Sequence, residues 1–154
     1  MVKVFVVYDT KYGNTRLVAE KIAEGMREVD GIETAISDVE EVDLEKVADC
    51  DAILIGSPNH WGGPSRTIRK FIDKLGKLDL KAKWVVVFDT YIKKDFEKAV
   101  KKMEKRIHEK FPNLKLTASG LSIKVGGMKG PIVEGELPKC KDFGKKVATQ
   151  LKSG

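Results

Sequence analysis

The first residues suited to chemistry form the segment Thr10-Lys11-Tyr12-Gly13-Asn14-Thr15. It combines two threonine hydroxyls, an amide side chain and a glycine between an apolar run, Val2–Tyr8, and a helical pattern. Backbone N–H groups at the start of a helix have no partner within the helix, and together with hydroxyl donors they suit a phosphate group. The nucleotide-binding patterns GxxxxGK and GxGxxG are both absent. The segment therefore predicts a phosphate site, with simple helix capping by Asn14 or Thr10 as the alternative.

A second segment, Gly56-Ser57-Pro58-Asn59-His60-Trp61-Gly62-Gly63-Pro64, follows the buried-strand pattern Ala52–Gly56. A tryptophan among turn residues is more often a stacking platform or an interface residue than part of a core. The alternative is that Trp61 packs over its own loop. Gly62 and Gly63 allow backbone conformations that other residues avoid. His60, a single loop histidine, is ambiguous.

The third segment, Asp89-Thr90-Tyr91, leaves the apolar run Trp84–Phe88, and again an aromatic residue follows small polar ones. Ligands of a parallel α/β sheet gather beyond the carboxyl ends of its strands, where all three segments are expected. Two aromatic side chains beside a phosphate cradle would enclose a flat heterocycle that carries a phosphorylated tail.

Alternating apolar runs and helical patterns must position these segments. The sequence predicts strands at Val2–Tyr8, Ile32–Val39, Ala52–Gly56, Trp84–Phe88 and Leu114–Val125, the last interrupted at Gly120. It predicts helices at Asn14–Val29, Asp43–Ala48, Pro64–Leu75, Asp95–Phe111 and Leu137–Leu151, with Pro64 in the first turn of its helix. Because each crossover returns the chain to the same end of the sheet, this order requires a parallel sheet with helices on both faces. No repeat or linker is evident, so residues 1–154 are expected to form one doubly wound α/β domain.

The charge of the chain is basic but dispersed. The formal net charge is +6, yet lysines alternate with glutamates along stretches such as Lys93–Lys110. Within that stretch Phe96, Val100, Met103 and Ile107 form one apolar stripe, which leaves the charged residues on the opposite face. A solvated helix face is therefore favoured over nucleic-acid binding.

Two further absences limit the classes of protein. No run of 18 or more apolar residues occurs, so the sequence predicts no membrane span. The two cysteines, Cys50 and Cys140, lie far apart and outside any CxxC pattern. Neither a disulfide framework nor a zinc site is expected, and a cytoplasmic location is favoured.

The three segments together resemble the flavodoxin family. Thr-x-Tyr-Gly-Asn-Thr after an apolar first strand resembles the family's phosphate signature, and Gly-Ser-Pro-x-x-Trp-Gly resembles its second flavin loop. Gly-Pro-Ile-Val-Glu-Gly-Glu-Leu before the final helix is similar to the flavodoxin-like domain of diiron flavoproteins. No insertion splits Leu114–Val125, so the chain resembles the short-chain group. The resemblance implies a flavodoxin-like, doubly wound, five-stranded parallel sheet in the order 2-1-3-4-5, with flavin mononucleotide (FMN) as cofactor.

The resemblance also assigns roles to individual residues, none of them catalytic or metal-binding. It implies that the phosphate is held by Thr10, Lys11, Tyr12, Gly13, Asn14 and Thr15. It implies that Ser57, Pro58, Asn59 and His60 line the ring and ribityl chain, with Trp61 against one ring face. Asp89, Thr90 and Tyr91 would border the other side, with Tyr91 as the stacking partner. The peptide after Trp61, between Gly62 and Gly63, would turn over on reduction and favour the neutral semiquinone.

Such a protein carries electrons between redox partner proteins. Flavodoxins are usually acidic, often with carboxylates after the second-loop tryptophan, whereas this chain has Gly62-Gly63-Pro64 there and cations nearby at Arg66, Lys93 and Lys94. We therefore expect a less negative semiquinone/hydroquinone potential than in acidic members, and partners with acidic docking faces. The chain is expected to be a monomer or a weak dimer.

The main alternative is a flavodoxin-like NAD(P)H:quinone reductase that uses the same fold and flavin. Such enzymes usually extend the second flavin loop and assemble as tetramers, whereas the spacing from Trp61 to Pro64 leaves little room for a nicotinamide pocket. A receiver domain needs clustered acids where this chain offers Asp9 alone, and a low-molecular-weight tyrosine phosphatase needs a cysteine in the first loop. Both of these are disfavoured.

Overall fold

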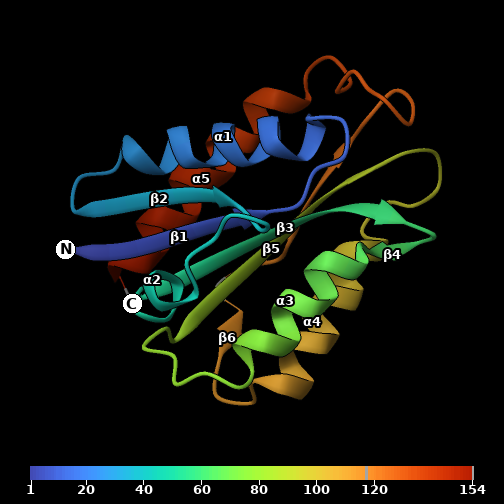
Figure 1. The fold of residues 1–154 in the computed structure, drawn as a ribbon. Helices are drawn as coiled ribbons and strands as arrows, with labels where there is room; N and C mark the ends of the chain where they lie inside the picture. The colour runs from blue at the N-terminus through green and yellow to red at the C-terminus, as the bar shows by residue number, and fades with distance from the viewer. Residues whose placement is uncertain (117, 154) are drawn as a thin grey trace.

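The apolar runs pair into a parallel sheet whose strand order places β1 in the interior (Figure 1). The computed structural model describes residues 1–116 and 118–153. The order is β2-β1-β3-β5, formed by β2 (Ile32–Asp38), β1 (Val2–Tyr8), β3 (Ala52–His60) and β5 (Trp84–Tyr91). Two short strands, β6 (Lys115–Leu116) and β7 (Leu121–Lys124), pair in parallel with opposite ends of β5. Counted as one interrupted fifth strand, they confirm the predicted order 2-1-3-4-5.

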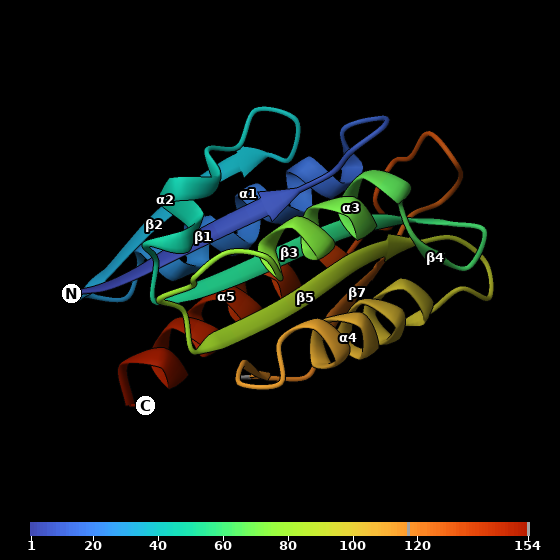
Figure 2. The ribbon, with the colours of Figure 1, turned by 60° about the horizontal axis from the view of Figure 1, so that its bottom comes forward.

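Helices cover both faces of the sheet, as predicted (Figures 1 and 2). On one face lie α1 (Asn14–Arg27) and α5 (Glu136–Ser153). On the other lie α3 (Arg66–Leu75) and α4 (Lys98–Lys110), and the short α2 (Leu44–Ala48) adds Val47 to the core on that side.

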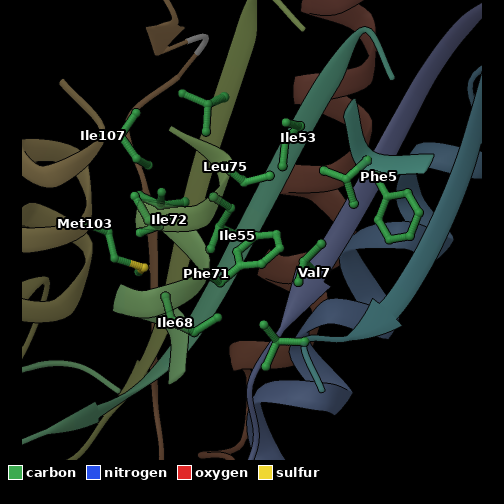
Figure 3. Packing of buried hydrophobic residues seen from close by; sticks show 14 of the residues in the cluster. Phe5, Val7, Ile53, Ile55, Ile68, Phe71, Ile72, Leu75, Met103 and Ile107 are labelled. Carbon is green, nitrogen blue, oxygen red and sulfur yellow. The ribbon is translucent and has the colours of Figure 1, made fainter. Parts of the chain in front are cut away.

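Two hydrophobic cores follow from the alternation of side chains along each strand. On β1, Phe5 and Val7 belong to the core under α3 and α4, whereas Val4 and Val6 belong to the core under α1 and α5. Figure 3 shows the first of these cores, where side chains of α3 meet those of β3 and α4. Full burial of one such aliphatic or aromatic side chain contributes about 1.5–3 kcal/mol. These cores fix the strand ends that carry the three polar segments.

Several element boundaries differ from the predicted ones. β3 continues to His60, and the two-residue strand β4 (Gly63–Pro64) returns antiparallel beside it, so most of the predicted second loop is a hairpin. The placement of Pro64 in the first turn of a helix is therefore wrong, because Ser65 caps α3 and Pro64 belongs to β4.

Two more corrections concern the third segment and the helix that follows it. Asp89, Thr90 and Tyr91 are the last residues of β5 instead of a loop. Phe96 does not join the buried stripe of α4: it precedes the helix, and 56% of its surface is exposed. Thr117, within the predicted strand Leu114–Val125, lies outside the described residues. Within the described ranges, no helix has both the length and the apolarity needed to cross a membrane.

Candidate functional site

A cavity of about 450 Å³ opens where β1, β3 and β5 end, and all three polar segments contribute to its wall. Eleven of the fifteen predicted binding residues line it: Thr10, Lys11, Tyr12, Asn14, Thr15, Pro58, Asn59, His60, Trp61, Thr90 and Tyr91. Parallel strands bring their carboxyl ends to one edge, which explains how segments 80 residues apart come together. Cavities of about 300–1,000 Å³ suit cofactor-sized ligands.

The first segment leaves the start of α1 open toward a ligand. Gly13 is the N-cap residue, with φ of 92°, and no side chain caps the helix. The hydroxyl oxygen of Thr10 accepts a hydrogen bond from Gly13 N at 2.9 Å and so shapes the turn before the helix. The alternative prediction, that Asn14 or Thr10 simply caps the helix, is therefore wrong. By contrast, side chains cap two other helices, Asp43 at α2 and Ser65 at α3.

The electrostatics of this helix start also favour an anion. The first turn of α1 carries no acidic residue. Unpaired N–H groups and the helix dipole together concentrate positive potential at such a terminus. The buried Thr15 hydroxyl hydrogen-bonds the Thr90 hydroxyl at 2.9 Å, which ties this terminus to the end of β5.

The second segment presents Trp61 at the tip of a tight hairpin. Asn59 pairs with Pro64 and His60 with Gly63, which leaves a two-residue loop of Trp61 and Gly62. Both loop residues have positive φ, 55° and 73°, as in the type I′ turn that suits a right-handed twisted hairpin. The indole of Trp61 is fully exposed and lines the cavity. Trp61 thus does not pack over its own loop.

The third segment includes a buried carboxylate that holds α4 in place. Asp89 has no exposed surface, and its carboxylate accepts hydrogen bonds from the Ser122 hydroxyl and from Val100 N, the latter at 3.0 Å. Burial raises the pKa of this carboxyl from 3.8 to about 6, although the two hydrogen bonds favour the charged form. The side chain therefore works as a remote cap for the start of α4.

Asn59 completes this link between the hairpin and the helix. Its amide nitrogen donates to Thr90 O at 2.9 Å, and its amide oxygen accepts from Ala99 N at 3.1 Å. One side chain thereby connects the end of β3 with the end of β5 and the first turn of α4. These hydrogen bonds lie within the protein, so they hold this part of the cavity wall without help from a ligand.

Tyr91 lies at the cavity wall with its ring edge-on to Phe96, at a centroid distance of 5.4 Å. The side chain is half-buried, and burial raises the pKa of its phenol above the ordinary value. Its ring is therefore neutral near pH 7 and available as an aromatic surface.

Four predicted binding residues do not line the cavity: Gly13, Ser57, Gly62 and Asp89. Gly13 and Gly62 supply the positive φ values described above. Ser57 is buried, donates to Pro58 O at 2.8 Å and accepts from Ser65 N at 2.9 Å, so its hydroxyl joins β3 to the start of α3.

Five lining residues were missed by sequence reasoning: Ile92, Asp95, Val125, Gly127 and Met128. Ile92 and Asp95 follow the end of β5, and the other three follow β7. The general rule about strand ends could have found Val125 to Met128, because these residues follow the fifth strand of the same parallel sheet. Met128 is 70% exposed, so the rim of the cavity is apolar there.

Comparison with known proteins decides the family. The family model described as a flavodoxin domain matches residues 5–123. The chain belongs to the flavodoxin family. Members of this family bind FMN, and within the part of the chain described here no group of three or more His, Cys, Asp or Glu residues could hold a metal ion.

Individual relatives agree with this assignment. A flavodoxin of Aquifex aeolicus is 41% identical over 73 residues, or 47% of this chain and 40% of that protein. The match thus spans about two fifths of that curated relative. Among solved structures, a flavodoxin from the domain Archaea is 23% identical with a TM-score of 0.83, covering 98% of this chain and 99% of that one. A flavodiiron core from Synechocystis sp. PCC6803 is 19% identical with a TM-score of 0.79, covering 99% and 36%. At these identities, the two structures show a shared fold alone.

Proposed function

We propose that this flavodoxin-family chain is an electron carrier that binds FMN in the cavity at the carboxyl ends of β1, β3 and β5. The observation that carries the proposal is the start of α1, which no side chain caps and which borders the cavity. A phosphomonoester supplies the acceptor oxygens and the negative charge that suit such a terminus. We further propose that residues 1–154 form a single domain and that the carrier works in the cytoplasm.

The residues of the cavity also fit the rest of the cofactor. Thr10, Asn14 and Thr15 would hold the phosphate, and Asn59 and His60 would border the ring and its ribityl chain. Bound flavin would supply one- and two-electron redox chemistry. The task of the chain is to bind and orient this group and to set its electrostatic surroundings.

Aromatic surfaces stand where the flat ring would need them. Trp61 is fully exposed at the hairpin tip, and Tyr91 lines the wall contributed by β5. The rings of aromatic side chains pack on flat heterocycles in offset or edge-to-face arrangements. We retain Trp61 and Tyr91 as the proposed neighbours of the two ring faces.

The short hairpin favours a carrier over an NAD(P)H:quinone reductase. Only Trp61 and Gly62 connect β3 to β4, so this loop adds no extended wall for a nicotinamide. Among the described residues that line the cavity, Asp95 alone carries a carboxylate, and cations stand nearby, since Arg66 follows the hairpin and Lys93 and Lys94 follow β5. The potential for adding the second electron to the bound flavin should therefore be less negative than in acidic family members. Redox partners would carry acidic docking faces, and the carrier would be a monomer or a weak dimer.

A comparison of FMN with riboflavin tests the proposed site directly. The two compounds share the ring and differ in the phosphate, so their affinities isolate the contribution of the α1 terminus. Hydrogen bonds to charged groups contribute about 1.5–3 kcal/mol each, so riboflavin should bind at least a hundredfold more weakly than FMN. Isothermal titration calorimetry of the flavin-free chain would measure both affinities.

Two outcomes would contradict the proposal. If the chain binds neither compound, the cavity is not a flavin site. If it binds both equally, the start of α1 does not hold the phosphate. Steady-state oxidation of NADH or NADPH with benzoquinone would separately favour the reductase.

A further inference from the structure

A second, basic groove lies beside the Trp61 hairpin, between α3 and α4. Its volume is about 600 Å³. Five cationic side chains line it, Arg66 and Arg69 from α3 and Lys102, Lys105 and Arg106 from α4. Their spacings of three and four residues place each set on one side of its helix.

Most of this positive charge is not neutralised by the protein itself. Arg106 forms a bidentate ion pair with Asp73, at 2.9 and 2.7 Å, which joins α4 to α3. The other four cations are exposed, and in residues 1–116 and 118–153 they form no ion pair with a carboxylate. One carboxylate, that of Glu109, lines the groove with them.

The opposite face of the molecule is built differently. There Lys141 of α5 contacts Glu24 and Glu28 of α1 at 3.4 and 3.0 Å, and Lys145 contacts Glu28 at 2.9 Å. These two lysines of α5 are thus compensated by carboxylates of the neighbouring helix. The groove therefore brings together, beside the hairpin, four cations of two adjacent helices that are unpaired among the described residues, whereas Lys141 and Lys145 each contact a carboxylate.

The groove adjoins the cavity proposed for FMN. His60 and Trp61 line both the groove and the cavity. Lys102 reaches the hairpin itself, because a Cβ added at Gly63 would lie 3.6 Å from Lys102 Nζ. A molecule that fills the groove would therefore stand next to the exposed indole.

We infer that the α3–α4 groove is the docking surface for a carboxylate-rich segment of the redox partner protein, an inference that rests on the proposed carrier function. Complementary charge steers association and orients the partner. The groove offers no uncapped helix start for a single phosphate, since the Ser65 hydroxyl accepts a hydrogen bond from Ile68 N at the start of α3. Exposed, separated cations on two helices instead match a series of carboxylates.

Two charge-reversal variants of equal net charge test this inference. The first, Arg69→Glu with Lys105→Glu, changes the groove. The control, Lys70→Glu with Lys101→Glu, changes exposed residues of the same two helices outside the groove. Each pair of reversals removes four units of charge and lowers the formal net charge from +6 to +2.

The probe is a fluorescein-labelled 20-residue poly-L-glutamate, titrated with each protein by fluorescence anisotropy at low ionic strength. We expect the groove variant to bind at least fivefold more weakly than the control, and added salt to remove the difference, because exposed charges are screened over about 8 Å at 0.15 M salt. Equal weakening by the two variants would assign binding to net charge and overturn the inference. Displacement of the peptide by NADPH from the parent protein, but not from the groove variant, would overturn it in favour of a nucleotide site.

The titration is run on the chain with and without FMN, so that the two proposals fail separately. If the chain does not bind FMN but the groove variant still binds the peptide more weakly than the control does, the carrier function alone is contradicted. If both variants bind FMN normally and bind the peptide equally well, the docking surface alone is contradicted.

Discussion

The substitution Asp89→Asn should remove a strong pH dependence of stability. Asp89 is fully buried and its carboxylate is hydrogen-bonded by Ser122 and Val100. Its pKa is raised from 3.8 to about 6 because burial penalises the charged form. The folded protein consequently binds the Asp89 proton more tightly than the unfolded chain does. Asparagine keeps the shape and an acceptor oxygen for Val100 N but cannot ionise.

The expected magnitude follows from this rise in the pKa. One pKa unit corresponds to about 1.4 kcal/mol, so the rise from 3.8 to about 6 corresponds to about 3 kcal/mol. This stabilisation is fully present below about pH 3.8, is lost as the pH rises through about 6, and is absent at pH 7. The free energy of unfolding of the parent protein, relative to that of the variant, should fall by about 2–3 kcal/mol between pH 4 and pH 7.

Urea denaturation of the two flavin-free proteins at several pH values would measure this difference. The comparison with the variant cancels the titration of other carboxyls. A suitable control is Asp73→Asn, because the ion pair with Arg106 lowers the pKa of Asp73 and should give the opposite trend, a parent advantage that grows with pH. A flat or rising difference for Asp89→Asn would refute the claim that burial outweighs the hydrogen bonds at this carboxylate.

Three further substitutions test the site and the core beneath it. Trp61→Ala should leave the urea midpoint of the flavin-free chain unchanged, since the indole is fully exposed, but should raise the Kd for FMN roughly ten- to a hundredfold, the cost of losing about 1–3 kcal/mol of stacking. Gly13→Ala should lower the free energy of unfolding by about 1–2 kcal/mol, because φ is 92° there although a Cβ would meet no atom within 4 Å; an unchanged urea midpoint would contradict this. Phe88→Ala, at a fully buried ring, should cost about 3–5 kcal/mol in the same assay, and a loss below 1 kcal/mol would mean that the core repacks.

The alternation of apolar runs with amphipathic helices predicted a parallel sheet with helices on both faces and a cavity beyond its strand ends, whereas the strand order 2-1-3-4-5 came from the resemblance to flavodoxins. A glycine and hydroxyls at a helix start indicated the segment that we propose to hold the phosphate, and the structure places most of this segment on the cavity wall. The sequence did not predict how far β3 and β5 extend, because polar residues at the end of a strand have the composition of a loop. Near the ends of these strands, Asn59 and Asp89 accept hydrogen bonds from Ala99 N and Val100 N at the start of α4, a long-range pairing that no local pattern reveals.

Two other departures have local causes. The side chain of Ser65 caps α3, so the helix begins at Arg66. Pro64, which was predicted in the first turn of this helix, pairs with Asn59 of β3 instead. Val125, the last residue of the predicted strand Leu114–Val125, lines the cavity together with Gly127 and Met128. The stretch that follows Val125 has the composition of a turn, and neither helical nor strand periodicity marks it. Its contribution could be inferred only from its place after β7.

The extension of β3 and β5 into the site determines how a ligand would be received. Pro58, Asn59, Thr90 and Tyr91 contribute to the cavity from within strands, where pairing with β4, β5, β3 and β7 already restricts the backbone. Association then spends little conformational entropy, since these walls need not fold around the incoming molecule. The heat-capacity change on association should reflect the apolar area covered and not a coupled folding reaction. Departure of the ligand would accordingly leave a receptor of nearly the same shape.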